Sequence, residues 1–322
     1  MKTGTALSTL ASAVLLALAA TGVHAQAYPN KPVKFIIGFA AGSSIEAMTR
    51  IVTDDINKRT GAIFVIEQKP GALGIIGMEA VAKAPADGYT LMPSSSATHS
   101  SGPQLTKLQT PDPVKDFTHL AALDTFSVML VVNASSGIKT PAQLVEAAKR
   151  SNLNYGYGSA TGQVTASAFA RAAGLGDLVV GVPYKSQPLA VTDLLGGHVH
   201  FASSDIPSVA PHIRSGKLNA LGVSGDKRSS LFPDVPTWTE AGVPAQLVGW
   251  VGVAGPAGLS EEVRTWWVRN ITAALGTSAV TEQFKTLGVE PLQMSGPAFT
   301  KFVGDQYQTW GRHIREAGIK PE

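Results

Sequence analysis

The sequence predicts an α/β fold whose strands pair mostly in parallel, arranged as two sheets. Short apolar runs of strand length alternate with segments that repeat apolar residues at helical spacing, almost from one end of the chain to the other. The 33 glycines and 20 prolines suit many short connections between such elements. A chain of 322 residues is long enough for two domains, each with its own core.

The first strand and the first helix illustrate this alternation. Residues 33–39 (VKFIIGF) form the apolar run of a buried strand. Helical spacing follows through Ile45, Met48 and Ile56, and Gly61 supplies a C-terminal stop. The other elements predicted before residue 100 are strands at 63–67 and 89–92 and a helix at 77–84.

The middle of the chain continues the pattern. Thr140, Pro141 and Gln143 provide an N-cap, a proline at the first helical position and a capping-box side chain, which predict a helix ending near Arg150. The remaining elements predicted here are strands at 128–132, 154–158, 179–183, 199–203 and 218–223 and helices at 165–173, 188–195 and 210–215.

The last part of the chain is predicted to form one strand and two helices. Residues 247–254 are strand-like, and Ser260 caps a helix that Gly276 ends. The final helix repeats large apolar side chains from Phe299 to Ile314, and Gly318 follows it. This aromatic stripe could form a ligand platform, but such a stripe is more often a core face, and we predict the core face.

The N-terminus predicts export. Lys2 precedes a 15-residue apolar stretch, residues 6–20, and Val23 and Ala25 put small residues where a signal peptidase cuts. The alternative, a membrane anchor, needs about 20 apolar residues. We therefore predict a signal peptide over residues 1–25, whose removal lowers the formal charge from +3 to +2 because Lys2 is its only charged residue (3 − 1 = 2).

Composition excludes several classes of function. The small net charge and the lack of any Lys/Arg block longer than two residues argue against nucleic acid as a partner. The chain has no cysteine, so it cannot use disulfides, a thiolate nucleophile or a cysteine metal site.

Three loops of small and polar residues come after predicted strands and before predicted helices. Their exposed N–H groups and hydroxyls, at the positive ends of helix dipoles, can hold an anion without an arginine. One such loop alone is more often only a turn with a capping hydroxyl, but three in equivalent places favour a carboxylate or phosphate site. The candidate residues are Phe39, Ala41, Gly42, Ser43 and Ser44 in the first loop, Ser94, Ser95, Ser96 and His99 in the second, and Ser159, Ala160, Thr161 and Thr165 in the third.

Signals for catalysis or metal binding are weak. The sequence contains no G-x-S-x-G elbow, phosphate-binding P-loop or dinucleotide fingerprint. His198 and His200 would lie on one strand face, but no third ligand is nearby, and an exposed face explains them better than a metal. His99 beside a serine leaves a hydrolase open as an alternative, although nothing identifies an orienting carboxylate. We expect no enzyme, no cofactor and no metal.

Short motifs along the mature chain resemble one family, the periplasmic solute-binding receptors of tripartite tricarboxylate transporters, also called the Bug family. Each motif is weak alone, but their order gives a strong signal. The matching segments are Tyr28–Pro32, Glu67–Ala72, Gly77–Ala84, Asp87–Leu91, Asp112–Phe117, Val182–Lys185, Asp193–Gly197, Phe232–Thr237 and His313–Lys320.

The resemblance implies a two-domain periplasmic binding protein of type II-like, flytrap architecture with crossover strands. Domain 1 would comprise residues 27–125 and 251–322, and domain 2 residues 126–250. It also implies a periplasmic monomer that binds a small carboxylate with the three loops above and Asp205, and that delivers it to the membrane subunits of a transporter.

Some residues depart from the family pattern. Ser43 stands where a glycine is usual and Glu46 where an aspartate is usual, while Ser167 replaces a histidine and Ile206 an asparagine. These departures affect the expected ligand and leave the expected fold unchanged.

Aromatic residues make the expected ligand more specific. Phe39, Phe126 and Trp250 could flank a flat ligand, which suggests an aromatic dicarboxylate such as terephthalate, although ordinary packing explains these residues equally well. A receptor that feeds a signalling sensor is a further alternative to transport.

Overall fold

The computed structural model describes residues 28–321. The described helices and strands lie in the compact unit Lys31–Glu322. The predicted signal peptide, residues 1–25, lies outside the described residues. Within the described part of the chain, no helix combines the length and the apolar character that crossing a membrane requires.

The strands join in one sheet. Along it the order is β2-β1-β3-β9-β4-β7-β5-β6, with β8 and β10 also paired to β4. The strands are β1 (Val33–Ile37), β2 (Phe64–Gln68), β3 (Thr90–Ser95), β4 (Phe117–Asn133), β5 (Leu153–Tyr157), β6 (Val179–Pro183), β7 (Phe201–Asp205), β8 (Leu218–Val223), β9 (Val248–Pro256) and β10 (Glu290–Pro291).

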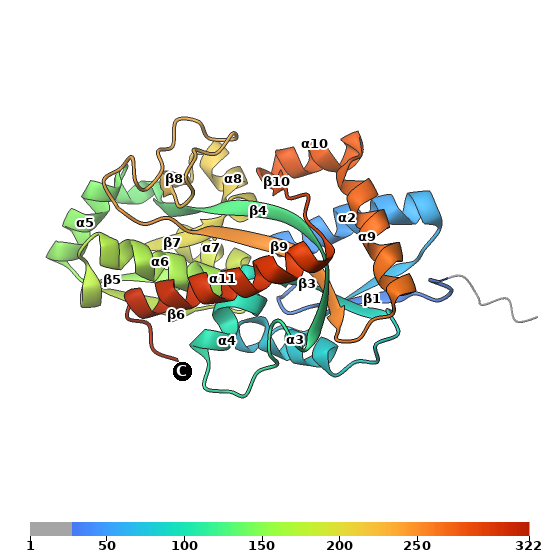
Figure 1. Ribbon diagram of the computed structural model, residues 1–322. Coiled ribbons are helices and arrows are strands. Elements are labelled where there is room, and N and C mark those ends of the chain that lie inside the picture. The colour runs from blue at the N-terminus through green and yellow to red at the C-terminus, as the bar shows by residue number, and fades with distance from the viewer. Residues whose placement is uncertain (1–27, 322) are drawn as a thin grey trace, which may run out of the picture. The chain divides into compact units, whose positions relative to one another are not determined.

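Two long strands connect the parallel parts of this sheet. β1 pairs in parallel with β2 and β3, and β5 pairs in parallel with β6 and β7. Between these groups, β4 and β9 run antiparallel to each other and to their other neighbours (Figure 1). The predictions of mostly parallel pairing and of two separate sheets are therefore wrong, because the crossover strands β4 and β9 join both groups into one mixed sheet.

Helices surround the sheet. The longest, α11, packs against β4 and against the short π-helix η2 (Figure 1). The helices are α2 (Ser44–Thr60), α3 (Ile75–Ala82), α4 (Gly102–Leu105), α5 (Pro141–Arg150), α6 (Ala160–Ala172), α7 (Gln187–Leu195), α8 (Ile206–Arg214), α9 (Glu261–Leu275), α10 (Ser278–Leu287) and α11 (Gly296–Glu316), with short helices η1 (Ala72–Gly74), η2 (Ser96–Ser101), η3 (Ala134–Ser136) and η4 (Gly176–Leu178).

The predicted helix ends are largely confirmed. Thr140 caps α5 by accepting a hydrogen bond from the Gln143 N–H, and Ser260 caps α9 in the same way. Gly61 ends α2 with φ +74°, a left-handed conformation that glycine adopts without a steric penalty.

Several elements differ from the prediction. β4 begins at Phe117, eleven residues before the predicted strand at Val128. His119 and Asp124 interrupt the apolar pattern of its buried first half, so the sequence pattern does not indicate a strand there. α6 begins at Ala160, within the predicted third loop. η2 and α10 are not among the predicted elements; η2 is rich in serine, which favours loops and caps over helix interiors.

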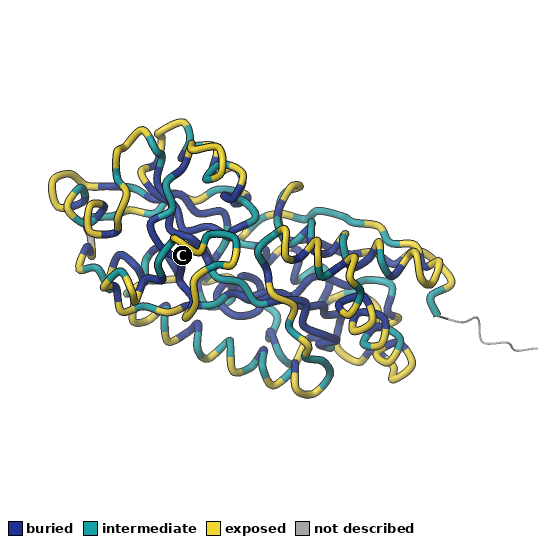
Figure 2. Tube along the Cα trace, turned by 90° about the horizontal axis from the view of Figure 1, so that it is seen from above, coloured by how far each residue is buried: buried dark blue, intermediate teal, exposed yellow. Residues whose placement is uncertain are grey.

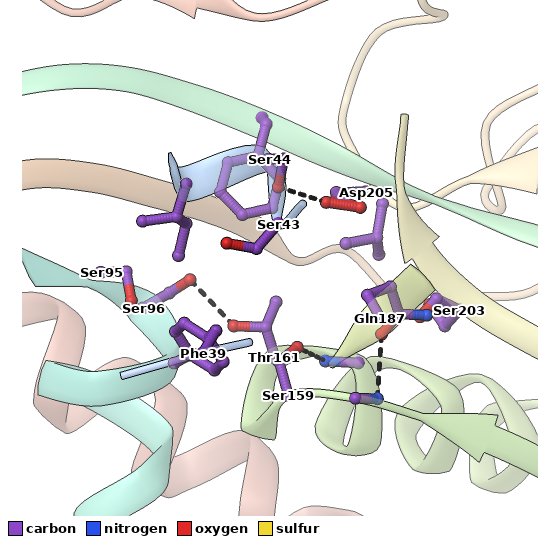
Figure 3. A pocket seen from close by; sticks show the side chains of 16 residues that line it. Phe39, Ser43, Ser44, Ser95, Ser96, Ser159, Thr161, Gln187, Ser203 and Asp205 are labelled. Carbon is purple, nitrogen blue, oxygen red and sulfur yellow. Dashed lines mark hydrogen bonds between the residues drawn. The ribbon is translucent and has the colours of Figure 1, made fainter. Parts of the chain in front are cut away.

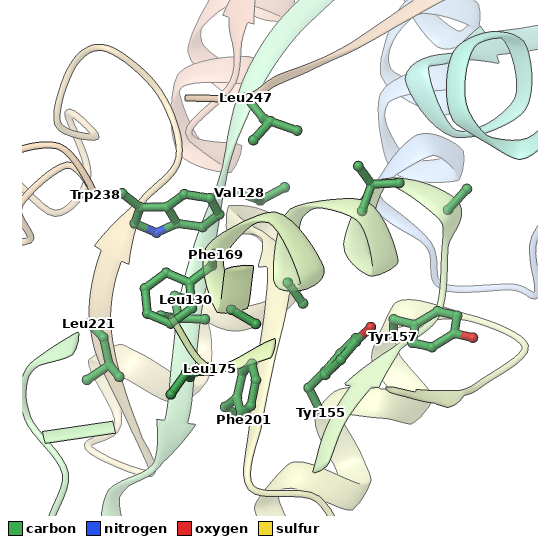
Figure 4. Close-up of a cluster of buried hydrophobic side chains, with 14 of the residues drawn as sticks. Val128, Leu130, Tyr155, Tyr157, Phe169, Leu175, Phe201, Leu221, Trp238 and Leu247 are labelled. Carbon is green, nitrogen blue, oxygen red and sulfur yellow. The ribbon is translucent and has the colours of Figure 1, made fainter. Parts of the chain in front are cut away.

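Buried residues follow the strands and one face of many helices (Figure 2). A large cluster beside β5 and β7 packs Phe169 against Trp238 and Tyr155 against Phe201 (Figure 4). On α11, Phe299, Val303, Trp310 and Ile314 are all buried, so the predicted core face of the last helix is confirmed. This packing fixes the strand ends from which the candidate site is built.

Candidate functional site

One pocket gathers residues from all three predicted loops (Figure 3). Its volume is about 50 Å³, measured as space open to the centre of a water molecule. On that measure a single water needs roughly 10–15 Å³, so this conformation encloses room for a few water-sized groups. The lining residues are Phe39, Ser43, Ser44, Ile45, Ser95, Ser96, Ala97, Phe126, Val128, Gly158, Ser159, Thr161, Gly162, Gln187, Ser203 and Asp205.

The first loop brings the start of α2 to the pocket. Ser43 is the N-cap, and its Oγ accepts a hydrogen bond from the Glu46 N–H at 3.4 Å. Burial raises the pKa of Glu46, but hydrogen bonds from Arg50 and from the Gly42 N–H outweigh that effect and leave the pKa lowered. Glu46 is therefore held as an anion at the start of its own helix, and Ser43, Ser44 and Ile45 line the pocket there.

The second loop is the junction of β3 and η2. Ser95 Oγ accepts from the Thr98 N–H at 3.3 Å, while Thr98 Oγ1 accepts from the Ser95 N–H at 3.2 Å. This capping box fixes the entry to η2. Ser95, Ser96 and Ala97 consequently line the pocket at a helix start.

The third loop is shorter than predicted and ends in the first turn of α6. Ser159 caps α6, its Oγ accepting from the Gly162 N–H at 3.1 Å. Thr161 and Gly162 line the pocket within that turn. Thr165 lies one turn further on and hydrogen bonds to Ser203 Oγ at 2.8 Å, so it supports a lining residue without lining the pocket itself.

Two hydrogen bonds cross the pocket between segments that are distant in the sequence. Ser96 Oγ and Thr161 Oγ1 are 3.0 Å apart, and Ser44 Oγ donates to Asp205 Oδ2 at 2.5 Å (Figure 3). They join the starts of η2 and α2 to the start of α6 and the end of β7. The three helix starts thus face one another around a single cavity.

Asp205 provides a carboxylate at the pocket wall. It ends β7 and precedes α8. Burial raises the pKa of this carboxyl above its ordinary value, and hydrogen bonds from Ser208, Ser44 and Ser204 offset part of the rise.

Another part of the pocket wall is formed by apolar side chains. Phe39, Ile45, Phe126 and Val128 give the pocket an apolar side. Trp250 does not line it; the indole is buried and donates to Ser100 Oγ at 3.2 Å.

Gln187 and Ser203 also line the pocket and are not among the residues predicted from the sequence. Gln187 Oε1 accepts from the Gly158 N–H at 3.0 Å. Gln187 starts the helix after a parallel strand, as the selected loops do, and that position was an available signal. Ser203 lies inside β7, and only the folded sheet places it here.

Other predicted residues lie outside the pocket lining. They are Ala41, Gly42, Ser94, His99, Ala160 and Thr165. His99 is fully buried, and its Nδ1 is 2.9 Å from Thr98 Oγ1, so its hydroxyl partner is a threonine and not a serine. This placement gives no support to a hydrolase that uses His99 in the pocket.

The His198 and His200 pair precedes β7 and is not part of that strand. His200 Nδ1 lies 2.6 Å from Asn154 Oδ1, an interaction that ties it to β5. In the described part of the chain, no cluster of three or more His, Cys, Asp or Glu side chains could hold a metal ion.

The fold and the site define a class. The mixed sheet with crossover strands is the architecture of two-domain periplasmic binding proteins. Residues 48–319 match the family described as "Tripartite tricarboxylate transporter family receptor", and the chain belongs to that family.

Individual relatives agree with this assignment. Protein BugT of Bordetella pertussis is 32% identical over 308 residues, which cover 94% of this chain and 94% of BugT. The structure of R. palustris Rpa4515 with adipate has a TM-score of 0.88 and 28% identity, covering 92% of this chain and all of that one. MatC from Rhodopseudomonas palustris with bound malate has a TM-score of 0.84 and 26% identity, covering 89% and 100% of the two chains. The family and these structural relatives are binding proteins.

Proposed function

We propose that this protein captures a small organic carboxylate in the periplasm and delivers it to the membrane subunits of a tripartite tricarboxylate transporter. The observation that carries the proposal is the convergence of three helix starts and their hydroxyl groups on one cavity. Helix N-termini offer unpaired N–H donors and a positive dipole, which together bind anions.

The relatives support a carboxylate over other anions. The structures of two relatives contain adipate and malate, both of which are dicarboxylates. Hydrogen bonds from N–H and O–H donors to an ionised carboxylate are stronger than those between neutral groups, so the lining hydroxyls suit this ligand class.

The proposed mechanism is closure of two domains on the ligand. Residues 27–125 and 251–322 form domain 1, and residues 126–250 form domain 2. The boundary falls where β4 and β9 pair, Thr125 with Trp250 and Phe126 with Gly249. Ligand contacts from both domains exist together only in the closed form, so binding shifts the population toward that form.

Export and assembly complete the proposal. A signal peptide over residues 1–25 directs the chain to the periplasm, where it acts as a monomer and without a cofactor. The family description supports a transporter as its partner. Delivery to a signalling sensor is the alternative that a binding measurement alone does not separate from transport.

The most specific ligand that we propose is terephthalate. The aromatic side chains of Phe39 and Phe126 in the pocket lining support it. The small cavity and the carboxylate of Asp205 weigh against it, since a fully ionised dianion would have to be accommodated beside that group. Terephthalate therefore belongs in the test panel as one member among several acids.

The test combines a ligand panel with two serine variants. Thermal unfolding of the mature protein is measured with aliphatic and aromatic mono-, di- and tricarboxylates, because a ligand that binds only the folded state raises the melting temperature. We expect Ser95→Ala and Ser159→Ala each to weaken binding of the best acid about tenfold, as loss of a hydrogen bond to a charged group implies.

Ser151→Ala serves as the matched control, because Ser151 is exposed and lies outside the pocket lining. Calorimetric affinities for the three variants decide the outcome. Unchanged affinity in both Ser95→Ala and Ser159→Ala would remove the proposed site, and no response to any carboxylate would remove the proposed function.

A further inference from the structure

The charge of the pocket is opposite to the charge usual for an anion site. Among the described residues that line it, Asp205 alone has an ionisable side chain, and no lysine, arginine or histidine is present. A carboxylate ligand would therefore bind through neutral donors and at the same time meet a fixed acidic group. The ligand must satisfy both conditions.

Asp205 has acceptor capacity that the protein does not use fully. Its Oδ2 accepts from Ser44 Oγ at 2.5 Å and from Ser208 Oγ at 3.2 Å. The contact of Oδ1 with Ser204 Oγ is long, at 3.5 Å. The Ser208 N–H also interacts with this carboxyl. An ionised carboxylate offers about four acceptor positions, and the long contact with Ser204 leaves room for a stronger hydrogen bond from a ligand in the pocket that Asp205 lines.

A second acidic group lies within electrostatic reach. Asp124 on β4 is fully buried, and neither of its carboxyl oxygens has a hydrogen-bond partner of normal geometry among the described residues. Burial raises the pKa of Asp124 well above its ordinary value, the nearby Val251 N–H lowers it, and the charge of Asp205 raises it further. The raised pKa favours the neutral acid at Asp124, so Asp205 is the acidic group that a ligand in the pocket meets.

The opposite requirements divide the pocket into two ends. The helix starts at Ser96 and Thr161 present donors, which suit a ligand carboxylate. Asp205 presents an acceptor, which suits a hydroxyl or ammonium group. The lining also includes Phe39 and Val128, which suit a short hydrocarbon segment.

We propose that Asp205 determines specificity by accepting a hydrogen bond from the ligand, so that the preferred ligand is an organic acid that also carries a hydroxyl or ammonium group. The inference rests on the proposed function and narrows its ligand class. A site built to accept a hydrogen bond discriminates against an analogue that lacks the donor, because its polar group is then left unpaired.

The test uses two series of acids that share a carbon skeleton. Succinate, malate and aspartate form one series, and propionate, lactate and alanine form the other. Their affinities are measured by calorimetry for the wild type, for Asp205→Asn and for Asp234→Asn. The Asp205→Asn change keeps the size of the side chain and removes its charge, while Asp234 is exposed and controls for the change in net charge.

In the wild type, a donor-bearing acid is expected to bind at least about tenfold more tightly than the unsubstituted acid of its series. Asp205→Asn should reduce that ratio to about threefold or less, and Asp234→Asn should leave it unchanged. A larger effect of Asp205→Asn on the amino acid than on the hydroxy acid identifies ammonium as the donor; the reverse identifies hydroxyl.

Three results would overturn the inference. One is a wild-type preference for the unsubstituted acids, which decides the matter even if Asp205→Asn does not fold. Another is an unchanged ratio in Asp205→Asn. The third is binding of donor-free dicarboxylates such as adipate or terephthalate with no binding of the six acids, which leaves the proposed function intact. Failure of every carboxylate to bind would overturn both proposals.

Discussion

His99 and His119 lie edge to face in the interior, with 5.6 Å between their ring centroids. His119 Nε2 donates to the Pro113 carbonyl at 2.9 Å, whereas His119 Nδ1 and His99 Nε2 have no partner among the described residues. Burial lowers the pKa of His119 to about 4, and burial together with the nearby His119 lowers that of His99. Both rings are therefore neutral at pH 7.

These histidines predict a loss of stability in acid. The unfolded chain binds protons near pH 6.5 and the folded chain does so only at lower pH, so the free energy of unfolding falls as the pH drops below about 6.5. For His119 alone, a folded pKa of about 4 implies a loss of about 2 kcal/mol between pH 7.5 and pH 5.

Urea unfolding of the wild type and of His119→Gln at both pH values measures this contribution. Glutamine can still donate to Pro113 but does not titrate, so the variant should lose less stability in acid. His198→Gln, at an exposed position, is the control and should behave as the wild type does. An equal loss in wild type and His119→Gln would show that His119 is not the group responsible.

Among the elements, the junction of β5 and α6 has the tightest packing at the site. A Cβ on Gly158 would lie 2.0 Å from the carbonyl carbon of Ser186, a backbone atom that cannot rotate away. The Gly158 N–H also donates to Gln187 Oε1. The start of α6 is thus held against the start of α7 by a contact that only glycine permits.

Gly158→Ala is therefore expected to lower the free energy of unfolding by about 2 kcal/mol or more, because the two segments must separate. Gly276→Ala is the control, since the nearest atom to its added Cβ would be 3.5 Å away. Chemical denaturation should find the control within about 0.5 kcal/mol of the wild type. A Gly158→Ala protein as stable as that control would contradict the packing described here.

Elements with a clear apolar period and a capping residue could be predicted from the sequence. α5 and α9 begin after the expected caps, Thr140 and Ser260. The first turn of α6 could not be predicted from the sequence, because Thr161 and Gly162 have low helix propensity. They are stabilised in the helix by the Ser159 cap and by burial.

The candidate site could be predicted in part for a similar reason. Ser44 and Ser159 follow strands and Ser95 ends one, so their place at the strand ends follows from the order of elements. Ser203 enters the pocket through the pairing of β7 with β4 and β5, which no local pattern specifies. The burial of His99 could not be predicted, because a serine-rich segment suggests an exposed loop, whereas η2 is buried and packs against α11.

At the scale of the whole molecule, β4 and β9 carry the chain between the two proposed domains, while side chains join those domains across the pocket. Ser96 belongs to domain 1 and Thr161 to domain 2 of the proposed division, and their oxygens are 3.0 Å apart. A cross-link at this position would hold the domains together. The chain has no native cysteine, so an engineered pair can form only the intended disulfide within one molecule.

The double variant Ser96→Cys with Thr161→Cys is expected to form that disulfide, because two hydroxyls in hydrogen-bond contact place their Cβ atoms near the separation that a disulfide requires, about 3.5–4.5 Å. If ligand enters and leaves by domain opening, the oxidised protein should exchange its best carboxylate at least about tenfold more slowly than the same protein after reduction. Stopped-flow displacement measures both rates, and Ser96→Cys alone controls for the loss of the hydroxyl. Equal rates in the oxidised and reduced forms would mean that the ligand passes without separation of Ser96 from Thr161, so that the flexible part of the molecule is a loop at the pocket and not the β4–β9 connection.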